Sequence, residues 1–274
     1  TTQLGLSYIR GLQGQGEYLK AAACAKHFAV HSGPEAERHH FDVHPSKKDM
    51  SETYLPAFEA AVKEGHVESV MGAYNAVNGY PCCGSPELLQ DYLRDNWGFE
   101  GHVVSDCWAI RDFHENHHFT DTPAESSAAA LKAGTDLNCG CTYRCLLTAL
   151  AQKLISEADI RQAAVRLFTT RYLLGIMDGQ HTEFDNIPYS KVECKAHTDY
   201  AIQAAEKGIV LLKNNGILPL CKENLTSIGV IGPNANSRAA LIGNYYGTSS
   251  RYITVLEGIQ DEVGDDVRVY YSQG

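Results

Sequence analysis

Short apolar runs alternate along the chain with longer segments in which apolar residues return every three or four positions. The short runs predict β-strands at residues 21–30, 66–75, 101–109 and 135–139. The longer segments between them predict amphipathic helices. A regular succession of strand and helix indicates right-handed crossovers and a parallel sheet, either a closed barrel or an open doubly wound sheet.

The predicted helices have recognisable boundaries. The segment 46–65 begins at Ser46, a candidate N-cap with Asp49 at the third helical position, and it ends at Gly65. Further helices are expected at 85–98, 122–134, 144–154 and 157–175. In the first helix, one face carries apolar residues at intervals of four, namely Met50, Tyr54, Phe58 and Val62.

The predicted strands end in polar side chains, most of them titratable. In a parallel sheet the carboxyl ends of the strands meet at one edge, where α/β proteins bind their ligands. We therefore expect a catalytic face at this edge. In chain order its candidate residues are Lys26, His27, His31, Tyr74, Asn75, Asp106, Asp136 and Asn138.

The composition changes near residue 178. Residues 179–197 are polar and weakly periodic, which indicates a linker. The rest of the chain predicts a helix, an apolar strand that includes 209–212, a turn at Asn215-Gly216, and a buried strand within 226–231. The chain is expected to end at the close of a further strand. These elements predict the beginning of a second α/β domain.

Composition narrows the classes of partner. The 274 residues are 44% hydrophobic, which is enough to fill a core. The formal net charge of −10 argues against a nucleic-acid partner, because nucleic acids are bound by basic faces. No apolar run approaches the roughly 20 residues that span a membrane, so no membrane partner is expected. The oligomeric state is unknown.

The nine cysteines do not show the C-x-x-C spacing of zinc sites. Two pairs are crowded, Cys82 with Cys83 and Cys139 with Cys141. We expect most of the nine to be small buried residues in a reducing compartment. Their odd number and clustering slightly favour the cytoplasm, and the localisation is otherwise unknown.

Three stretches resemble glycoside hydrolase family 3, and most closely its β-glucosidase and β-xylosidase members. They are "AKHFAVHSGPEAERHHFD", "VMGAYNAVNGYPCCGSPELLQDYLRDNWGFEGHVVSDCWAI" and "AEKGIVLLKNNGILPL" followed by "IGVIGPNAN". Their order and spacing match the family over nearly the whole chain. The resemblance implies an α/β protein with a partial (β/α)8-type barrel at 1–178, a linker at 179–197 and the incomplete start of an α/β/α sandwich at 198–274.

The resemblance also implies a catalytic site. The family's catalytic nucleophile is the aspartate of an S-D-x segment, which matches Asp106 in "VVSDCW". The implied substrate is a small glycoside or oligosaccharide with a terminal β-D-glucosyl or β-D-xylosyl residue, and no metal or other cofactor is expected. The residues expected to contact the sugar are Lys26, His27, Arg38, Tyr74 and Trp108.

The chemistry of a retaining glycosidase explains these residue types. One ionised carboxylate attacks the sugar, and one protonated carboxyl, about 5–5.5 Å away, protonates the leaving oxygen. Lys26 and Arg38 would favour the ionised form of Asp106. For Glu35 we expect a salt bridge with Arg38. The family's acid/base glutamate is expected beyond residue 274, so the chain resembles a fragment that is truncated at both ends.

Two other functions stay open. Without an acid/base, the chain could be a catalytically inactive carbohydrate-binding fragment. The segment "HENHH" at His114–His118 matches the H-E-x-x-H zinc signature, which makes a zinc hydrolase a remote alternative. Pro123 follows closely and the third-ligand extension of zincins is missing, so we expect a loop with polar contacts instead. The loop 244–246 either approaches the sugar site or packs on the surface.

Overall fold

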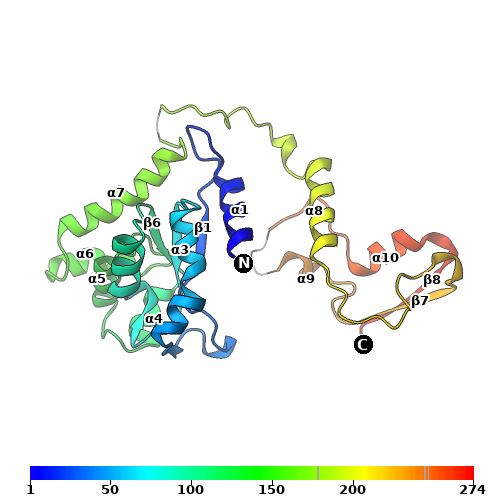
Figure 1. Cartoon of the computed structure of the whole chain (residues 1–274), viewed down its shortest axis with the longest axis horizontal. Helices are drawn as coiled ribbons and strands as arrows, with labels where there is room; N and C mark the ends of the chain where they lie inside the picture. Colours follow the sequence, from blue (N-terminus) through cyan, green and yellow to red (C-terminus); the bar gives the residue numbers. More distant parts are fainter. Residues whose placement is uncertain (178, 244, 246) are drawn as a thin grey trace. The chain divides into compact units, whose positions relative to one another are not determined.

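Figure 1 shows the computed structural model of the chain. The chain forms two compact units, Thr1–Asp185 and Asn186–Gly274, each held together by contacts within itself. The domain boundary expected at residue 178, with a linker after it, stays a prediction. Asn244 and Tyr246, at the ends of the loop considered for the sugar site, lie outside the described residues. The structure describes residues 1–177, 179–243, 245 and 247–274.

The first unit is built on a parallel three-stranded sheet. Strand β3 (Ser69–Gly72) lies between β1 (Cys24–Phe28) and β6 (His102–Ser105), and all three strands run in the same direction. The fourth predicted strand is reduced to an isolated parallel bridge between Leu137 and Val104. The strands therefore lie side by side in chain order, and their carboxyl ends meet at one edge as predicted.

The helix predicted at 46–65 is present but interrupted. Ser46 is its N-cap, as predicted, and the Ser46 hydroxyl accepts a hydrogen bond from the backbone N–H of Asp49 (3.1 Å). Pro56 interrupts the segment because it has no N–H to donate to a preceding carbonyl. The segment consists of α2 (Lys47–Asp49), a π-helical turn (Met50–Tyr54) and α3 (Pro56–Lys63). The predicted apolar face is confirmed, since Met50 and Val62 are buried and Tyr54 and Phe58 pack against the same core.

The other predicted helices of this unit are also present. Gly134 follows α5 (Pro123–Ala133) with a φ of 113°, a left-handed conformation that suits a residue without a Cβ. Among the described residues of this unit, two α-helices were not predicted: α1 (Thr2–Gln13) and the helix that follows β6. A small second sheet joins β2 (Asp42–Val43), β4 (Ala76–Val77) and β5 (Tyr80–Pro81). The confirmed helices are the π-helix η4 (Glu87–Asn96), α5 (Pro123–Ala133), α6 (Leu146–Ala151) and α7 (Glu157–Leu173), and a further helix, α4 (Ala109–Glu115), follows β6.

The core lies between the sheet and these helices. Phe28, Val70 and Val103 are fully buried and come from β1, β3 and β6. Leu93 of η4 is also fully buried, and the ring of Phe28 makes an edge contact with the ring of Trp97. Truncating such a phenylalanine to alanine costs about 3–5 kcal/mol, because a cavity adds to the lost transfer free energy. This packing fixes the strand ends on which the candidate residues lie.

The described residues of the second unit form a two-stranded parallel sheet and three α-helices. Strand β7 (Ser227–Ile231) pairs over its whole length with β8 (Arg268–Ser272), so the strands predicted within 226–231 and at the close of the chain are confirmed. The helices are α8 (Lys195–Gly208), α9 (Arg238–Ile242) and α10 (Val255–Val263).

Two predictions for the second unit are wrong. Residues 209–212 are exposed and form no strand. Within the described part of this unit, strand pairing occurs only between β7 and β8. Strand β7 is not a buried strand, since Val230 is its only buried residue. The turn is confirmed: Gly216 has a φ of 93° and donates its N–H to the side-chain oxygen of Asn214 (3.0 Å).

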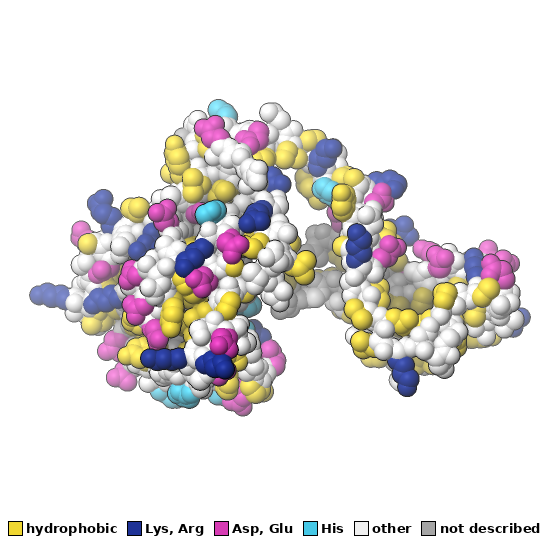
Figure 2. Space-filling model, in the orientation of Figure 1, with side chains coloured by type: hydrophobic (Ala, Val, Ile, Leu, Met, Phe, Trp, Pro, Cys, Tyr) yellow, Lys and Arg dark blue, Asp and Glu magenta, His cyan; other side chains and the backbone are white. Residues whose placement is uncertain are grey.

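The surface carries charges of both signs. On the face shown in Figure 2, acidic and basic side chains are interspersed over both units. Within the described part of the chain, no helix combines the length and the apolar character that would let it cross a lipid bilayer.

Candidate active site

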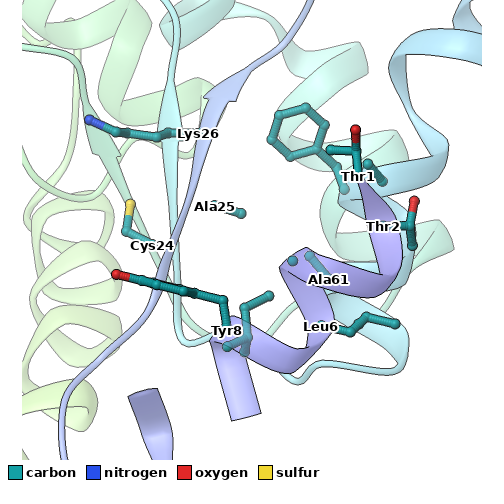
Figure 3. Close-up of a pocket in the computed structure, with 12 residues that line it drawn as sticks. Thr1, Thr2, Leu6, Tyr8, Cys24, Ala25, Lys26 and Ala61 are labelled. Atoms are coloured by element: carbon teal, nitrogen blue, oxygen red, sulfur yellow. The ribbon is translucent and has the colours of Figure 1, made fainter. Parts of the chain in front are cut away.

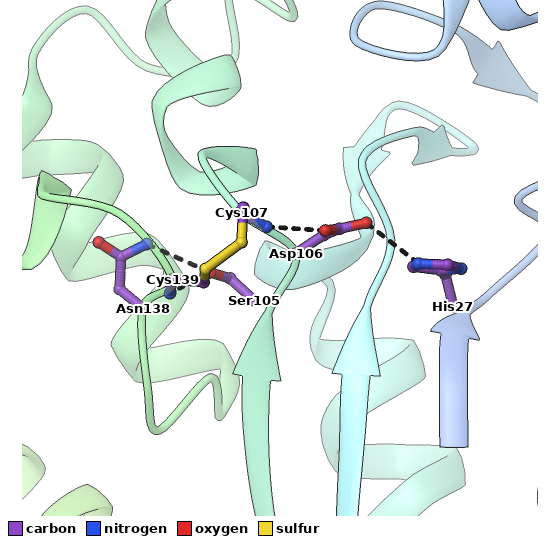
Figure 4. Close-up of a disulfide and its surroundings, with 6 residues drawn as sticks. All are labelled: His27, Ser105, Asp106, Cys107, Asn138 and Cys139. Atoms are coloured by element: carbon purple, nitrogen blue, oxygen red, sulfur yellow. Dashed lines mark hydrogen bonds and ion pairs between the residues drawn. A yellow bond between two sulfur atoms is a disulfide. The ribbon is translucent and has the colours of Figure 1, made fainter. Parts of the chain in front are cut away.

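The predicted nucleophile and the predicted sugar-binding histidine face each other at the carboxyl edge of the sheet. Nε2 of His27, on β1, lies 3.3 Å from Oδ2 of Asp106, which directly follows β6 (Figure 4). The backbone N–H of Asp106 donates to the carbonyl of Gly72 at the end of β3 (3.0 Å), and its Oδ1 accepts from the N–H of Cys107 (2.7 Å). Three neighbouring strand ends thus determine where this carboxylate lies.

His27 is half-buried, and its burial has an electrostatic consequence. Burial lowers the pKa of His27, although the negative charge of Asp106 opposes this change and the positive charges of Lys26 and Arg38 add to it. The imidazole is therefore neutral near pH 7. A neutral ring carries one N–H donor and one acceptor nitrogen, so it can contact both a carboxylate and a sugar hydroxyl.

Tyr74 and Arg38 lie beside this pair. The Arg38 guanidinium carbon is 4.9 Å from the centre of the Tyr74 ring. Burial, with the nearby negative charge of Asp106, raises the pKa of Tyr74 to about 12, so its phenol stays protonated and can donate a hydrogen bond. The Arg38–Glu35 salt bridge is present as predicted (2.5 Å), and this hydrogen bond raises the pKa of Arg38.

Lys26 and His27 are adjacent in β1 and line one cavity of about 270 Å³ together with His31, Tyr54 and Phe58. A second cavity of about 330 Å³ lies between α1 and β1 and also includes Lys26 (Figure 3). The walls of the second cavity are mainly apolar, whereas the first is lined by His27, the residue that faces Asp106.

Trp108 has an unusual backbone conformation and an exposed ring. Its φ is 72°, a left-handed value that is rare for a bulky residue, and 42% of the residue is exposed. The Trp108 N–H donates to the carbonyl of Cys139 (2.7 Å), and the guanidinium of Arg111 lies 5.1 Å from its ring centre. The ring is thus accessible two residues from Asp106, where an aromatic surface can pack against a sugar.

The site contains a second pair that sequence reasoning missed. Nδ1 of His39 lies 2.8 Å from Oδ2 of Asp112, a carboxylate whose side chain is only 1% exposed. The His39 ring packs against the Tyr74 ring with 4.5 Å between centroids. His31, which was among the polar candidates, lies 3.2 Å from the side-chain oxygen of Asn75. A separation of 73 residues between His39 and Asp112 gives no sequence pattern from which their contact could be read.

The "HENHH" segment supports this site through other contacts. Helix α4 ends at Glu115 and His118 has a φ of 52°, so its outer histidines do not lie on one continuous helix. His114 Nδ1 lies 2.9 Å from the Ser126 hydroxyl, and His117 Nε2 lies 2.8 Å from the Tyr74 carbonyl oxygen. Within residues 1–177, 179–243, 245 and 247–274, no cluster of three or more histidine, cysteine or acidic side chains could bind a metal ion.

Asp136 was expected at the catalytic face, but its carboxylate is 1% exposed and paired with two arginines. Its Oδ2 accepts from Arg94 (2.9 Å) and from the N–H of Val103 (2.9 Å), and its Oδ1 accepts from Arg166 (3.2 Å). Burial raises the pKa of Asp136, and these partners oppose that change. We correct its role to a structural one, because the carboxylate has no exposed surface for a ligand.

The cysteines differ from expectation in two ways. Cys107 and Cys139 form a disulfide that was not predicted, and the crowding of Cys139 with Cys141 did not reveal it. Most cysteines are free thiols as expected, but of these only Cys82 and Cys83 are buried. Burial raises the pKa of the Cys82 thiol to about 12, so it is not a reactive thiolate.

Comparisons with known proteins identify the family. Residues 1–171 match the glycosyl hydrolase family 3 N terminal domain, and residues 209–270 match the glycosyl hydrolase family 3 C-terminal domain. A xylan 1,4-beta-xylosidase of Xylanibacter ruminicola is 44% identical over 95% of this chain and 31% of its own length. A probable beta-D-xylosidase 7 of Arabidopsis thaliana is 38% identical over 100% of this chain and 37% of its own. The chain therefore spans about a third of the length of these curated relatives.

Solved structures agree with this assignment. A GH3 exo-beta-xylosidase in complex with a xylobiose aziridine activity-based probe superposes with a TM-score of 0.89 at 36% identity, over 98% of this chain and 36% of the other. A beta-glucosidase from Listeria innocua in complex with glucose has a TM-score of 0.83 at 29% identity, over 99% of this chain and 38% of its own. The chain, a mixed α/β structure, belongs to glycoside hydrolase family 3.

Proposed function

We propose that the protein carrying this chain is a retaining exo-β-glycosidase that releases terminal β-D-xylosyl or β-D-glucosyl residues, with Asp106 as the nucleophile. The observation that carries the proposal is the 3.3 Å approach of His27 Nε2 to Asp106 Oδ2 at the carboxyl edge of the parallel sheet. Both residues lie in the segments that resemble the family's motifs, which supports the proposal. We also propose that the strands, parallel and in chain order, belong to a (β/α)8-type barrel followed by an α/β sandwich.

The proposed mechanism has two steps. Asp106 attacks the anomeric carbon, the leaving oxygen takes a proton from an acid, and a covalent glycosyl-aspartate forms; water, deprotonated by the same group, then releases the sugar. Oδ1 of Asp106 already accepts a hydrogen bond from the Cys107 N–H, whereas Oδ2 faces His27. We propose Oδ2 as the attacking atom, because its partner is a side chain that a sugar hydroxyl can replace.

The acid/base must be a second carboxyl group. Glu35 is paired with Arg38, and Asp112 is paired with His39 and buried. A general acid must be free to donate a proton to the leaving oxygen, and both of these carboxylates are already engaged by their partners. We therefore assign the acid/base role to neither of them.

The remaining site residues bind the sugar in this proposal. Lys26 and His27 contact ring hydroxyls from the cavity that they share, and these contacts strengthen as positive charge develops at the anomeric centre. Tyr74, protonated because its pKa is raised to about 12, donates to the sugar or to Asp106. Arg38 adds positive charge beside the nucleophile, and Trp108 packs on a sugar face. We propose xylosyl as the preferred residue, because the curated relatives quoted above are xylosidases.

The experiment compares the parent protein with its Asp106→Ala variant on p-nitrophenyl β-D-xyloside, β-D-glucoside and α-L-arabinoside. We expect the variant to lose at least about 1,000-fold in kcat, because the covalent route is removed. Azide should restore part of the rate by attacking the anomeric carbon in place of Asp106, with inversion of configuration. A variant within tenfold of the parent rate would exclude Asp106 as the nucleophile. A parent that binds xylose or glucose in calorimetry but turns over no glycoside would support the inactive carbohydrate-binding alternative.

A further inference from the structure

We propose that the Cys107–Cys139 disulfide is a redox-sensitive positioning element for the nucleophile and for Trp108. This inference rests on the proposed function of Asp106. In this proposal, Cys107 and Cys139 hold the residues of the site in position. A dithiol reductant should therefore lower the turnover of the folded protein.

The disulfide joins two neighbouring strand ends at the catalytic edge. Cys107 directly follows Asp106, and Cys139 lies two residues after Leu137, which bridges to β6. Figure 4 shows the two sulfur atoms beside the turn that carries Asp106, with His27 on its other side. The disulfide thereby links two positions that are 32 residues apart in sequence, immediately next to the nucleophile.

Hydrogen bonds connect the same two turns. The Cys139 N–H donates to the Ser105 hydroxyl (3.0 Å), and the Asn138 side chain donates to the same oxygen (3.2 Å). The Trp108 N–H donates to the Cys139 carbonyl (2.7 Å). Movement of the Cys139 turn would therefore displace Ser105 and Trp108, the residues on either side of the Asp106–Cys107 pair.

The Trp108 backbone gives an independent reason for such a constraint. A φ of 72° is unfavourable for a residue with a large side chain, so it persists only where the surroundings fix it. One neighbour is Gly140, at which an added Cβ would lie 3.3 Å from the Trp108 ring. The other is the disulfide, one residue before Trp108. Without the covalent bond, Trp108 can relax, and the Cys107 N–H that donates to Asp106 Oδ1 can move with it.

The bond is accessible to chemistry. Cys107 and Cys139 are both half-buried, so neither cysteine is enclosed in the core. A dithiol thiolate attacks one sulfur, the S–S bond breaks, and the released thiolate takes a proton. The second thiol of the reagent then closes its own disulfide and releases the other cysteine as a thiol. The protein disulfide is reduced by two electrons, and the dithiol is oxidised by two.

The test measures kcat and KM of the parent protein before and after treatment with dithiothreitol, using the p-nitrophenyl glycoside that it hydrolyses fastest. Peptide mapping with a thiol label establishes the state of Cys107 and Cys139 in each sample. Circular dichroism defines an assay temperature at which both forms are folded. We expect reduction to lower kcat about tenfold, because small displacements of a nucleophile cost that much, and to raise KM through Trp108. Reoxidation should restore both values.

Three variants make the test specific. Cys107→Ser with Cys139→Ser should have the low kcat of the reduced parent, and it should not respond to dithiothreitol. Cys141→Ser, which removes an exposed free thiol two residues from Cys139, should behave as the parent does. Asp106→Ala separates the two proposals, since an active Asp106→Ala variant would remove the proposed function itself.

Three results would overturn the positioning role alone. The first is a fully reduced parent that keeps its kcat and KM while the Asp106→Ala variant is inactive. The second is peptide mapping that finds free thiols at both positions in the untreated protein. The third is reduction that unfolds the protein at every assay temperature instead of lowering kcat in the folded form.

Discussion

His39 and Asp112 are 73 residues apart in the chain, yet His39 Nδ1 lies 2.8 Å from Asp112 Oδ2. The buried Asp112 carboxylate orients the His39 imidazole, and the His39 ring packs against the ring of Tyr74. Tyr74 lies beside the site of the proposed nucleophile. We infer that this pair positions Tyr74, because a ring in contact with both the His39 imidazole and the Arg38 guanidinium has little freedom to rotate.

His39→Ala should lower kcat/KM by about tenfold, because Tyr74 loses a packing partner and the buried Asp112 keeps only the Asn116 side-chain amide as a side-chain donor. His39→Asn should recover part of the loss, since the asparagine side-chain amide can donate where Nδ1 does. The adjacent His40 is a matched control: it pairs with Glu37, and both side chains are half-exposed. Equal losses for His39→Ala and His40→Ala would contradict the positioning role.

His102 predicts how stability depends on pH. Burial, followed by the positive charge of Arg94, lowers the pKa of His102, which lies 3.1 Å from the Ser69 hydroxyl and 2.8 Å from that of Thr170. The unfolded chain therefore takes up a proton at a higher pH than the folded protein does. The contribution of His102 to the free energy of unfolding is complete above about pH 6.5 and is lost as the pH falls through the lowered pKa.

Urea unfolding between pH 7.5 and 5 tests this sign. His102→Gln keeps a hydrogen-bonding group but does not titrate, so its deficit against the parent should shrink as the pH falls. His44→Gln, which replaces a histidine whose side chain is exposed, is the control for removing a surface histidine. If the parent and His102→Gln curves stay parallel over this range, burial of a neutral His102 does not contribute to the pH dependence.

The buried Asp136 predicts a large stability effect. Replacing it with alanine leaves Arg94 and Arg166 without their shared carboxylate, and such a loss typically costs about 3–5 kcal/mol. The control is Glu115→Ala, which breaks a half-exposed pair with Arg111 and should cost less than about 1 kcal/mol. Chemical unfolding of both variants gives the comparison, and similar costs would contradict the structural role assigned to Asp136.

The zinc alternative at His114–His118 predicts metal dependence, whereas the proposed glycosidase chemistry needs no metal. We expect EDTA to leave turnover of the p-nitrophenyl glycosides unchanged, and elemental analysis to find less than about 0.1 zinc per chain. Stoichiometric zinc, lost together with activity on chelation and restored by added zinc, would return the zinc hydrolase to consideration.

Local patterns predicted much of the sheet and its helices, because capping and periodicity are properties of neighbouring residues. Ser46 caps its helix, and His27 and Asp106 meet because parallel strands share an edge. The sequence could not show the His39–Asp112 or Cys107–Cys139 contacts, since tertiary structure alone brings those residues together.

Other errors have the same origin. The position of Asp136 at a strand end predicted catalysis, but arginines from two helices surround it. The apolar residues 209–212 predicted a strand, but a strand also needs a pairing partner, which no local pattern specifies. Composition and periodicity describe what a segment can do, whereas burial and pairing depend on the rest of the molecule.

The most direct test of the central claim is to trap the intermediate and locate it. Incubation of the parent protein with 2-deoxy-2-fluoro-β-D-xylosyl fluoride should slow the second step and leave a fluoroxylosyl ester. Proteolysis and mass spectrometry should then find one added fluoroxylosyl group on the peptide that contains Asp106, with the fragment ions placing it on that residue. An adduct on another carboxylate, or time-dependent inactivation that leaves the Asp106 peptide unmodified, would contradict the account.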